Sequence, residues 1–267
     1  MAQPISIIIT CCNNEQTIEA ACASCTWADE IVVVDSGSTD RTVEIAKRFT
    51  DRVIIEPWRG GYSKQKEFAT SQARNDWVFI VDSDEEVSTE LAAEVQSWDQ
   101  AYFDRWDIIH VPRKNWVLGR FVRAWLPDYG SRIFHRDRVR WNEHVLHDAR
   151  EPLDPSRVTH SRCHLLHKRI GRQEFEGYFS GKRMDARVMP VARQMYDRGR
   201  RCHWWDLLFR PWGAFFKFYI MKRGFLDGTF GLMMAQKASV SVQLKYAALW
   251  AIQNDPELAG DDQSDAS

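Results

Sequence analysis

The sequence predicts an α/β fold built on a doubly wound, mostly parallel sheet of the Rossmann-like kind, with a helical appendage at its C-terminal end. Two observations predict it. Short apolar runs rich in β-branched residues recur through the first ninety residues, with helical patterns between them. An acidic cluster, Asp82-Ser83-Asp84-Glu85-Glu86, directly follows one of these runs. Alternating strands and helices form βαβ units, and ligands of such sheets bind outside the carboxyl ends of the strands.

The pattern predicts four strands, which span residues 5–10, 30–35, 52–56 and 77–81. Their nearly continuous Ile and Val content suits strands that are buried on both faces of a parallel sheet. A helix is expected after each strand. Asn13 or Asn14 can cap the first helix, which has apolar residues at helical spacing. The second is expected over 42–49 after a turn at 36–40, the third over 63–74, and the fourth begins near Ser88.

Composition indicates one large domain with an appendage. The chain has 267 residues, of which 44% are hydrophobic, and a formal net charge of −1. The N-terminus lacks the basic start of a signal peptide, and its first apolar run is too short for one. The six cysteines do not have the paired spacing of a metal knuckle; Cys22 and Cys25 form a lone C-x-x-C. We therefore expect reduced thiols in a cytosolic protein, in preference to a zinc or redox site.

Positive charge is concentrated late in the chain. Residues 157–223 contain 16 Lys/Arg and 5 Asp/Glu, and aromatic residues are interleaved between 204 and 219. This composition favours a surface that meets anionic, amphipathic material such as a membrane. The alternative is that the aromatic residues pack against the back of the sheet. The near-neutral total charge argues against nucleic acid as the partner, and Arg210 and Lys217 interrupt the apolar run too closely for a membrane span.

The acidic cluster suits a divalent metal bound to a diphosphate. Mg²⁺ and Mn²⁺ prefer hard oxygen ligands, and phosphate and water complete their coordination shell. Alternation along an extended segment would turn Asp82 and Asp84 to the same side, and Asp84 is the stronger candidate ligand. The alternative is an acidic loop that caps the helix beginning near Ser88.

Three motifs resemble the GT-A glycosyltransferases of family 2. They are Thr10-Cys11-Cys12-Asn13-Asn14-Glu15, the segment 32–42 with Asp35-Ser36-Gly37-Ser38-Thr39-Asp40, and the segment 76–85 with Asp82-Ser83-Asp84. Residues 127–134 and 222–228 resemble the branch that includes bacterial lipopolysaccharide core glycosyltransferases, often β-glucosyltransferases. The chain departs from the family in having Cys11-Cys12 where a Lys, Tyr or Leu commonly precedes Asn-Glu, and in having His147-Asp148 where a His-Glu pair is usual.

The resemblance implies an inverting, Mg²⁺- or Mn²⁺-dependent transferase that moves a hexose from a UDP-sugar donor to a glycan or lipid-linked acceptor, as in lipopolysaccharide core synthesis. It also implies work on the cytoplasmic face of the membrane, with the enzyme bound peripherally to an anionic surface. We expect residues 1–95 to hold the nucleotide half of the GT-A domain and 96–170 the acceptor half. Residues 171–267 would form the helical, basic and aromatic region that meets membrane or acceptor.

On the donor side, the resemblance assigns Asp35 to the uracil imide. Ser38, Thr39 and Asp40 already offer helix caps, which would leave Asp35 free. Thr10 and Glu15 are expected to line the same crevice and contact base or ribose; Glu15 is alternatively a first-turn acid favoured by the helix dipole. Asp82 would meet ribose or metal, and Asp84 would bind the metal. Lys66 could approach the phosphates from the third helix.

On the acceptor side, one carboxylate must take the proton of the attacking hydroxyl. Asp128 is the first choice, and Arg132 is expected to steady the developing diphosphate charge. Asp128 is alternatively a turn residue between Pro127 and Gly130, and Glu143 and Asp148 compete with it. His147 is a candidate metal ligand or diphosphate contact in a segment that is rich in histidine: His144, His147, His160, His164 and His167.

Two other function classes were compared with this one. A phosphotransferase of the haloacid dehalogenase type also uses Asp-x-Asp after a strand, but it requires the motif on the first strand, and here the motif follows the fourth. A non-catalytic protein that docks on membranes would explain the basic aromatic segment. It gives no reason for acids at successive strand ends, so the transferase is preferred.

Overall fold

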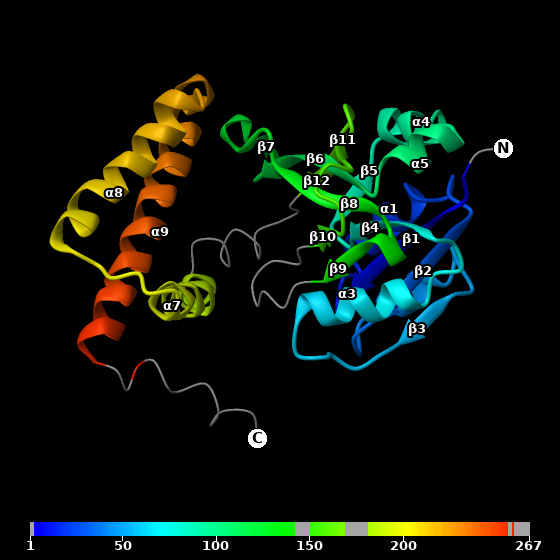
Figure 1. Cartoon of the computed structure of the whole chain (residues 1–267), viewed down its shortest axis with the longest axis horizontal. Coiled ribbons are helices and arrows are strands. Elements are labelled where there is room, and N and C mark those ends of the chain that lie inside the picture. The colour runs from blue at the N-terminus through cyan, green and yellow to red at the C-terminus, as the bar shows by residue number, and fades with distance from the viewer. Residues whose placement is uncertain (1–2, 142–149, 169–180, 256–257, 259–267) are drawn as a thin grey trace. The chain divides into compact units, whose positions relative to one another are not determined.

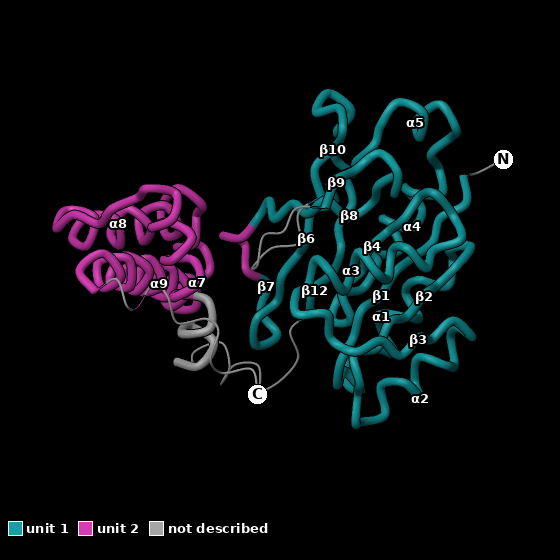
Figure 2. Tube along the Cα trace, turned by 60° about the horizontal axis from the view of Figure 1, so that its bottom comes forward, with its two compact units in different colours: residues 1–121, 126–170 teal, residues 122–125, 171–267 magenta. Residues whose placement is uncertain are grey.

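The computed structural model describes residues 3–141, 150–168, 181–255 and 258 of the chain (Figure 1). The chain divides into two compact units. Unit 1 contains residues 1–121 and 126–170, and unit 2 contains residues 122–125 and 171–267 (Figure 2). Each unit has its own hydrophobic core, and each is described separately below.

Unit 1 is a mixed sheet flanked by helices. Its nucleotide-side strands are β1 (Ile5–Cys11), β2 (Glu30–Asp35), β3 (Val53–Ile55) and β4 (Trp77–Asp82), all parallel, in the order β3-β2-β1-β4. The connecting helices are α1 (Ile18–Ala23), α2 (Thr42–Ala46) and α3 (Tyr62–Ser71). These four strands are the four that the sequence predicts, and their parallel pairing is the βαβ arrangement expected from the alternation.

The sheet continues through antiparallel strands. β8 (Tyr129–His135) lies between β4 and β6 (Ile108–Val117) and is antiparallel to both. β12 (Leu165–Lys168) pairs with β6 in parallel and with β5 (Glu85–Val87) in antiparallel fashion. The other elements of unit 1 include α4 (Thr89–Gln96), α5 (Gln100–Arg105), β7 (Arg120–Phe121), a 3₁₀ turn at Arg136–Arg138, β9 (Val139–Trp141), β10 (Arg150–Pro152) and β11 (Val158–His160).

The core of unit 1 has one layer on each face of the sheet. Alternate residues of β1 point to opposite faces, so Ile7 and Ile9 join the layer under α1 while Ile8 joins the layer under α3. All three side chains are completely buried. This two-sided burial explains why the strand reads as a continuous apolar run without polar alternation.

The start of α1 differs from the prediction. The helix begins at Ile18, and neither asparagine caps it with its side chain. Asn14 Oδ1 accepts the Cys12 N–H at 2.8 Å, and Asn13 Oδ1 accepts the Thr39 N–H at 2.8 Å. Both side chains therefore bond neighbouring loops. The fourth helix does begin as expected, because the Ser88 hydroxyl accepts the Leu91 N–H at 3.1 Å.

The six cysteines are all free thiols, as predicted. Cys22 and Cys25 lie in the core under α1, and burial raises the pKa of each thiol to about 12. A buried thiol with a raised pKa is poor both as a nucleophile and as a metal ligand. The C-x-x-C spacing is thus a consequence of helical packing in this chain.

Unit 2 is helical. Its elements include α7 (Gly181–Asp197), α8 (Trp204–Phe216), a π-helical turn at Lys217–Met221 and α9 (Gly228–Asn254). A small core joins α7, α8 and α9 through Ala192, Leu207 and Leu249, among others. Within the part of the chain that the structure describes, no helix is both long and apolar enough to cross a membrane. The expectation that the basic aromatic segment does not span a bilayer agrees with this finding.

Candidate active site

Three predicted site residues lie at the carboxyl ends of adjacent parallel strands. Thr10 is paired in register with Asp82 of β4, and Cys11 is paired with Asp35 of β2. Paired residues of a parallel sheet point to the same face, and successive residues point to opposite faces. Thr10 and Asp82 are therefore directed to the α3 face, whereas Asp35 is directed to the α1 face. The structure brings all three to one edge but not to one face.

Asp35 is not free, contrary to the expectation from the available caps. Its Oδ2 accepts the N–H groups of Gly37 at 2.9 Å and Ser38 at 2.7 Å, and its Oδ1 accepts the Ser38 hydroxyl. The Cys11 thiol also lies 3.5 Å from Oδ1. Burial and the adjacent carboxylate raise the pKa of Cys11, which keeps this thiol protonated as a donor. Asp35 thus fixes the turn after β2.

Glu15 lies outside α1, so the alternative of a first-turn acid in that helix is wrong. Its side chain is exposed, and Oε2 accepts the Arg41 N–H at 3.2 Å. Its own N–H donates to Asp40 Oδ2 at 3.1 Å. These bonds join the loop after β1 to the start of α2, so that Glu15 stands at the rim of the strand ends near Asp35.

Asp82 is held between two cations that the sequence predicts for the phosphates. Lys66 Nζ lies 2.6 Å from Oδ1, and Arg132 Nη2 lies 3.0 Å from Oδ2. Burial alone would raise the pKa of Asp82, but Arg132 and Lys66 outweigh it and hold that pKa well below its ordinary value. Lys66 comes from α3 and Arg132 from β8, so the two cations converge from different elements on one carboxylate.

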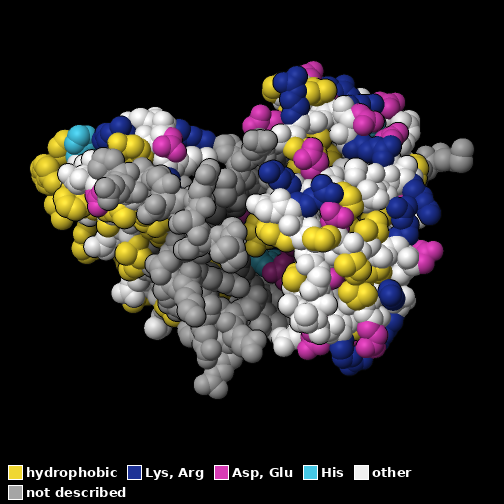
Figure 3. Space-filling view, turned by 90° about the horizontal axis from the view of Figure 1, so that it is seen from below, with side chains coloured by type: hydrophobic (Ala, Val, Ile, Leu, Met, Phe, Trp, Pro, Cys, Tyr) yellow, Lys and Arg dark blue, Asp and Glu magenta, His cyan; other side chains and the backbone are white. Residues whose placement is uncertain are grey.

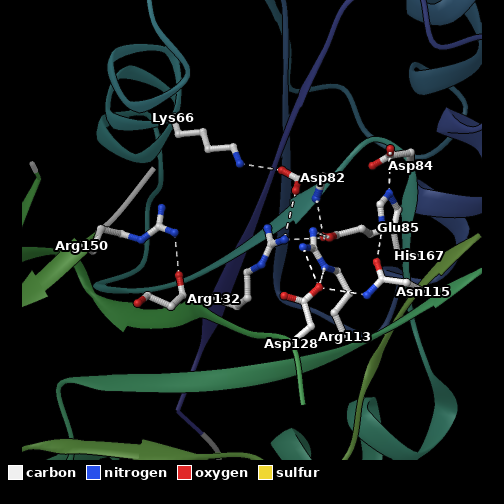
Figure 4. A network of polar contacts seen from close by, with 11 residues as sticks. Lys66, Asp82, Asp84, Glu85, Arg113, Asn115, Asp128, Arg132, Arg150 and His167 are labelled. Atoms are coloured by element: carbon white, nitrogen blue, oxygen red, sulfur yellow. Dashed lines mark hydrogen bonds and ion pairs between the residues drawn. The ribbon is translucent and has the colours of Figure 1, made fainter. Parts of the chain in front are cut away.

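Glu85 connects this group to the acceptor side (Figure 4). Its side chain is completely buried, and Oε1 accepts Arg132 Nη2 at 2.7 Å and Arg113 Nη1 at 2.9 Å. Its Oε2 accepts the Asp82 N–H at 3.1 Å. The alternative that the acidic loop caps the next helix is therefore wrong for Glu85, because the Ser88 hydroxyl caps α4. Two arginines on one buried carboxylate link β5 to β6 and β8, and the Asp82 N–H links it to the end of β4.

Asp128 is more than a turn residue. Its Oδ2 accepts three N–H groups, from Arg113 Nε at 2.9 Å, Arg113 Nη2 at 2.8 Å and Asn115 Nδ2 at 2.9 Å. These donors all come from β6, and all three contact the same oxygen. Three donors from two side chains, one of them a charged guanidinium, hold this oxygen in place. Asp128 is joined through Arg113 to Glu85, and thereby to Arg132 and Asp82.

Asp84 and Asp82 do not share an orientation, contrary to the prediction. Ser83 and Asp84 form a turn between β4 and β5, so the alternation of an extended segment does not apply. The Asp84 carboxylate instead points to His167 of β12, with 3.0 Å between Oδ2 and Nε2 (Figure 4). His167 is buried.

The protonation of His167 follows from its other neighbour. Asn115 Nδ2 donates to Asp128, which leaves Asn115 Oδ1 to accept from His167 Nδ1 at 2.7 Å. The proton of a neutral imidazole is then on Nδ1, and the lone pair of Nε2 faces the Asp84 carboxylate. Two lone pairs do not approach to 3.0 Å without a shared hydrogen or a metal ion between them.

This pair fits a divalent metal. Two neighbouring ligands of an octahedral ion, each about 2.1 Å from it, stand about 3 Å apart. The described residues hold no group of three or more His, Cys, Asp or Glu arranged for a metal. Mg²⁺ commonly takes only one or two protein ligands and obtains the rest from phosphate and water. His147, predicted as a tentative ligand, and its neighbours Glu143, His144 and Asp148 lie outside the described residues.

Sequence reasoning missed four members of the network: Glu85 as a buried anchor, Arg113, Asn115 and His167. His167 belongs to the histidine-rich segment that the sequence shows. It reaches the acidic cluster after β4 because β12 pairs with β5, and the sequence does not reveal that pairing. Arg113 and Asn115 are two apart on β6, which places them on one face. That spacing alone does not identify their partner, Asp128.

The sequence of the chain matches a known protein family. A family model described as Glycosyl transferase family 2 matches residues 6–153. An uncharacterized glycosyltransferase of Rickettsia bellii (strain RML369-C) is 43% identical over 97 residues, which are 36% of this chain and 33% of that protein. The match spans a third or less of each of the first Rickettsia relatives. The lipopolysaccharide core biosynthesis glycosyltransferase LpsC of Rhizobium meliloti (strain 1021) is 27% identical over 264 residues, 92% of each chain.

Solved structures with similar architecture include S. aureus TarS 1-349 in complex with UDP-GlcNAc. It is 16% identical, covers 96% of this chain and 92% of its own, and has a TM-score of 0.46. Another is glucosyl-3-phosphoglycerate synthase from Mycobacterium tuberculosis in complex with Mg²⁺ and uridine-diphosphate. It is 24% identical, covers 44% of each chain, and has a TM-score of 0.33.

Proposed function

Because the chain belongs to glycosyl transferase family 2, whose model matches residues 6–153, we propose that it is an inverting enzyme with a UDP-hexose as donor. The acceptor is a hydroxyl of a glycan or lipid-linked glycan of the cell envelope, in the class of the lipopolysaccharide core. The observation that carries the proposal is the continuous polar network from Lys66 to Asp128 (Figure 4). It joins cations suited to a leaving diphosphate to a carboxylate suited to an attacking hydroxyl.

The donor's diphosphate is proposed to bind beside Asp82. Lys66 and Arg132 both contact this carboxylate, and each is a cation that a diphosphate can attract. Asp82 is then the anchor that keeps the two cations oriented before donor arrives. The negative charge that develops on UDP as it leaves is stabilised by these cations, which are already oriented and need little reorganisation.

The nucleoside is proposed to bind at the ends of β1 and β2. The uracil imide would donate to Asp35 Oδ1, where the Cys11 thiol, a weak donor, and the Ser38 hydroxyl now lie. Thr10 and Glu15 are retained as contacts to base or ribose, because Thr10 lies at the same sheet edge as Asp35 and Glu15 lies in the loop that follows β1. Replacing a weak thiol donor with an imide N–H favours binding of uracil.

Mg²⁺ or Mn²⁺ is proposed to be held by Asp84 and His167, the pair whose 3.0 Å separation and lone-pair arrangement fit such an ion. When bound, the ion would neutralise diphosphate charge. Asn115 orients His167 through its Nδ1–H, and Asp128 orients Asn115. This series of hydrogen bonds, which orients the proposed metal ligand His167, therefore ends on the proposed base.

Asp128 is proposed to be that base. Arg113 and Asn115 hold Oδ2, and Oδ1 takes the proton of the acceptor hydroxyl. The hydroxyl oxygen bonds to the anomeric carbon of the sugar as the bond from that carbon to the UDP oxygen breaks, with inversion at carbon. The proton remains on Asp128, and the electron pair leaves on UDP. Holding one carboxylate oxygen rigidly aligns the other with the attacking group.

The acceptor class rests on one relative. LpsC of R. meliloti, named for lipopolysaccharide core biosynthesis, aligns with 92% of this chain. This near full-length alignment supports an acceptor of the same class. We propose in addition that the enzyme works on the cytoplasmic face of the membrane. The sugar is read by hydrogen bonds to single hydroxyl groups, so donor identity is a question for experiment.

A panel of UDP-hexoses and UDP-N-acetylhexosamines, each with Mn²⁺, tests the proposal. We expect release of UDP from one or a few of them, faster in the presence of an envelope glycolipid extract. Asp128→Asn should lower transfer by about 10²–10⁴-fold with little change in UDP affinity. Asp137→Asn is the matched control, since Asp137 lies in a 3₁₀ turn after β8, outside the network. If Asp128→Asn transfers sugar as fast as the control does, Asp128 is not the base.

A further inference from the structure

Unit 2 presents a continuous apolar face on α8. Six large side chains of this helix are exposed: Trp204 (68%), Trp205 (46%), Leu208 (49%), Phe209 (61%), Trp212 (69%) and Phe216 (55%). At about 100° per residue, all six lie within about 140° of the helix circumference. We name these six residues the outer face of α8. Isolated exposed apolar residues are ordinary, but a contiguous face of this size marks an interaction site.

The outer face is separate from the side of α8 that packs within unit 2. Pro211 is buried, its carbonyl accepts the Ser239 hydroxyl of α9 at 2.9 Å, and Leu207 packs into the core with Leu249 of α9. By helical spacing Leu207 lies about 140° and Pro211 about 100° around the helix from Trp212, so both stand outside the arc of the outer face. The helix therefore carries one apolar side for its own unit and a second that the described chain does not cover.

The apolar surface continues beyond the helix. The π-helical turn and the residues after it expose Ile220 (44%), Met221 (69%), Phe225 (46%) and Leu226 (56%). Figure 3, seen from below, shows hydrophobic side chains gathered at the left of the view, on the side where Figure 1 places α8. Several tryptophans with one apolar and one polar edge are typical of side chains that sit at the boundary between lipid and water.

Positive charge is concentrated in the same stretch of the chain as this surface. Residues 198–223 contain seven Lys/Arg and a single acid, Asp206. Asp206 is buried and forms ion pairs with Arg200 and Arg210, so it contributes no exposed negative charge. Lys217 and Arg223 are exposed cations in this stretch of the chain. Basic residues near an anionic bilayer are attracted to it, so the charge pattern favours an anionic lipid surface over a neutral one.

We propose that the outer face of α8 inserts into the interface of an anionic membrane, with the helix lying in the membrane plane. The helix has the features of an interfacial helix: an exposed aromatic face, basic residues in the same stretch of the chain and no spanning length. A second copy of the chain is disfavoured as occupant, because the net positive stretches of two copies would repel each other. The docking proposal depends on the proposed function in one respect only. Its purpose would be to bring the site to a lipid-linked acceptor.

The test is flotation of the full chain with vesicles of phosphatidylcholine, with and without phosphatidylglycerol. Wild type should float with the anionic vesicles and far less with the neutral ones. Trp204→Ser combined with Trp212→Ser should weaken partition at least about tenfold, since each side chain loses apolar burial. Trp58→Ser combined with Tyr62→Ser is the matched control, because both side chains are exposed aromatics of unit 1. This control should float like wild type.

The result that overturns the proposal is equal flotation of wild type and the Trp204/Trp212 variant, or equal flotation on neutral and anionic vesicles. A wild type that stays off vesicles but sediments as a dimer, with the variant monomeric, overturns it in favour of a second copy. UDP binding measured on the same samples separates the two proposals. If the wild type binds no UDP, the proposed function is contradicted, and flotation still tests the docking. We expect the Trp204/Trp212 variant to bind UDP as wild type does.

Discussion

Exchanging Glu85 for glutamine perturbs the centre of the polar network with the smallest change of shape. The Glu85 carboxylate accepts two guanidinium N–H groups on Oε1 and the Asp82 N–H on Oε2. A glutamine amide has one accepting end and one donating end. In either orientation its NH₂ group faces a donor, so at least one buried hydrogen bond is lost and the two arginines lose their shared negative charge.

The expected cost follows from burial. Removing one partner of a buried ion pair costs about 3–5 kcal/mol. The Arg132 side chain is 8% exposed, but that of Arg113 is 28% exposed and solvent screens part of its charge. We therefore expect the lower end, about 3 kcal/mol of unfolding free energy. Because Arg113 also holds Asp128, the turnover number should fall in the fraction that remains folded.

Urea unfolding followed by circular dichroism measures this cost, with Glu86→Gln as the control. Glu86 is the next residue, and it pairs at 2.9 Å with Lys168, whose side chain is 48% exposed. A surface pair of this kind contributes at most about 1 kcal/mol. If Glu85→Gln destabilises the chain no more than Glu86→Gln does, the two arginines do not depend on Glu85, and the network is not the scaffold of the site.

Further predictions concern the metal pair and Asp82. Asn115→Leu removes the acceptor of His167 Nδ1–H and should weaken Mn²⁺ binding about 10–100-fold, as measured by calorimetry in the presence of UDP; unchanged affinity would contradict the proposed tautomer. Arg132 and Lys66 hold the folded-state pKa of Asp82 well below 3.8, despite the opposing effect of burial. A depressed pKa stabilises the fold above the unfolded-state pKa of about 4, and this stabilisation is lost as the pH falls through and below that value. The stability difference between wild type and Asp82→Asn should therefore shrink on acidification from pH 6 to about 3, and a difference independent of pH would show that the cations do not act on Asp82.

The fold class was accessible from the sequence because local composition determines it. Continuous Ile and Val in β1 and β2 require burial on both faces, and this requirement leads directly to a parallel sheet with helices on either side. Family membership confirms both the GT-A fold class and the enzyme class that the motifs predict. Thr10, Asp35 and Asp82 were correctly placed at one sheet edge because parallel strands end together.

The orientation of single side chains was less accessible. The Asn13 and Asn14 side chains have several backbone N–H groups in reach, and competition between loops, not sequence, decided which they bond. The predicted orientation of Asp84 was wrong because a two-residue turn interrupts the extended segment. Its contact with His167 joins residues 83 positions apart and depends on the register of β12 against β5. Such a register is set by packing of the whole sheet.

Calorimetric titration of UDP into the protein, with and without Mn²⁺, tests the central claim most directly. The account predicts that wild type binds UDP with Mn²⁺ present, that omission of the metal weakens binding strongly, and that Asp84→Asn removes the metal dependence. Glu86→Gln, which leaves the Asp84–His167 pair intact, should bind as wild type does. A wild-type chain that binds no UDP in the presence of Mn²⁺, or an Asp84→Asn variant that keeps the full metal dependence, would contradict the account.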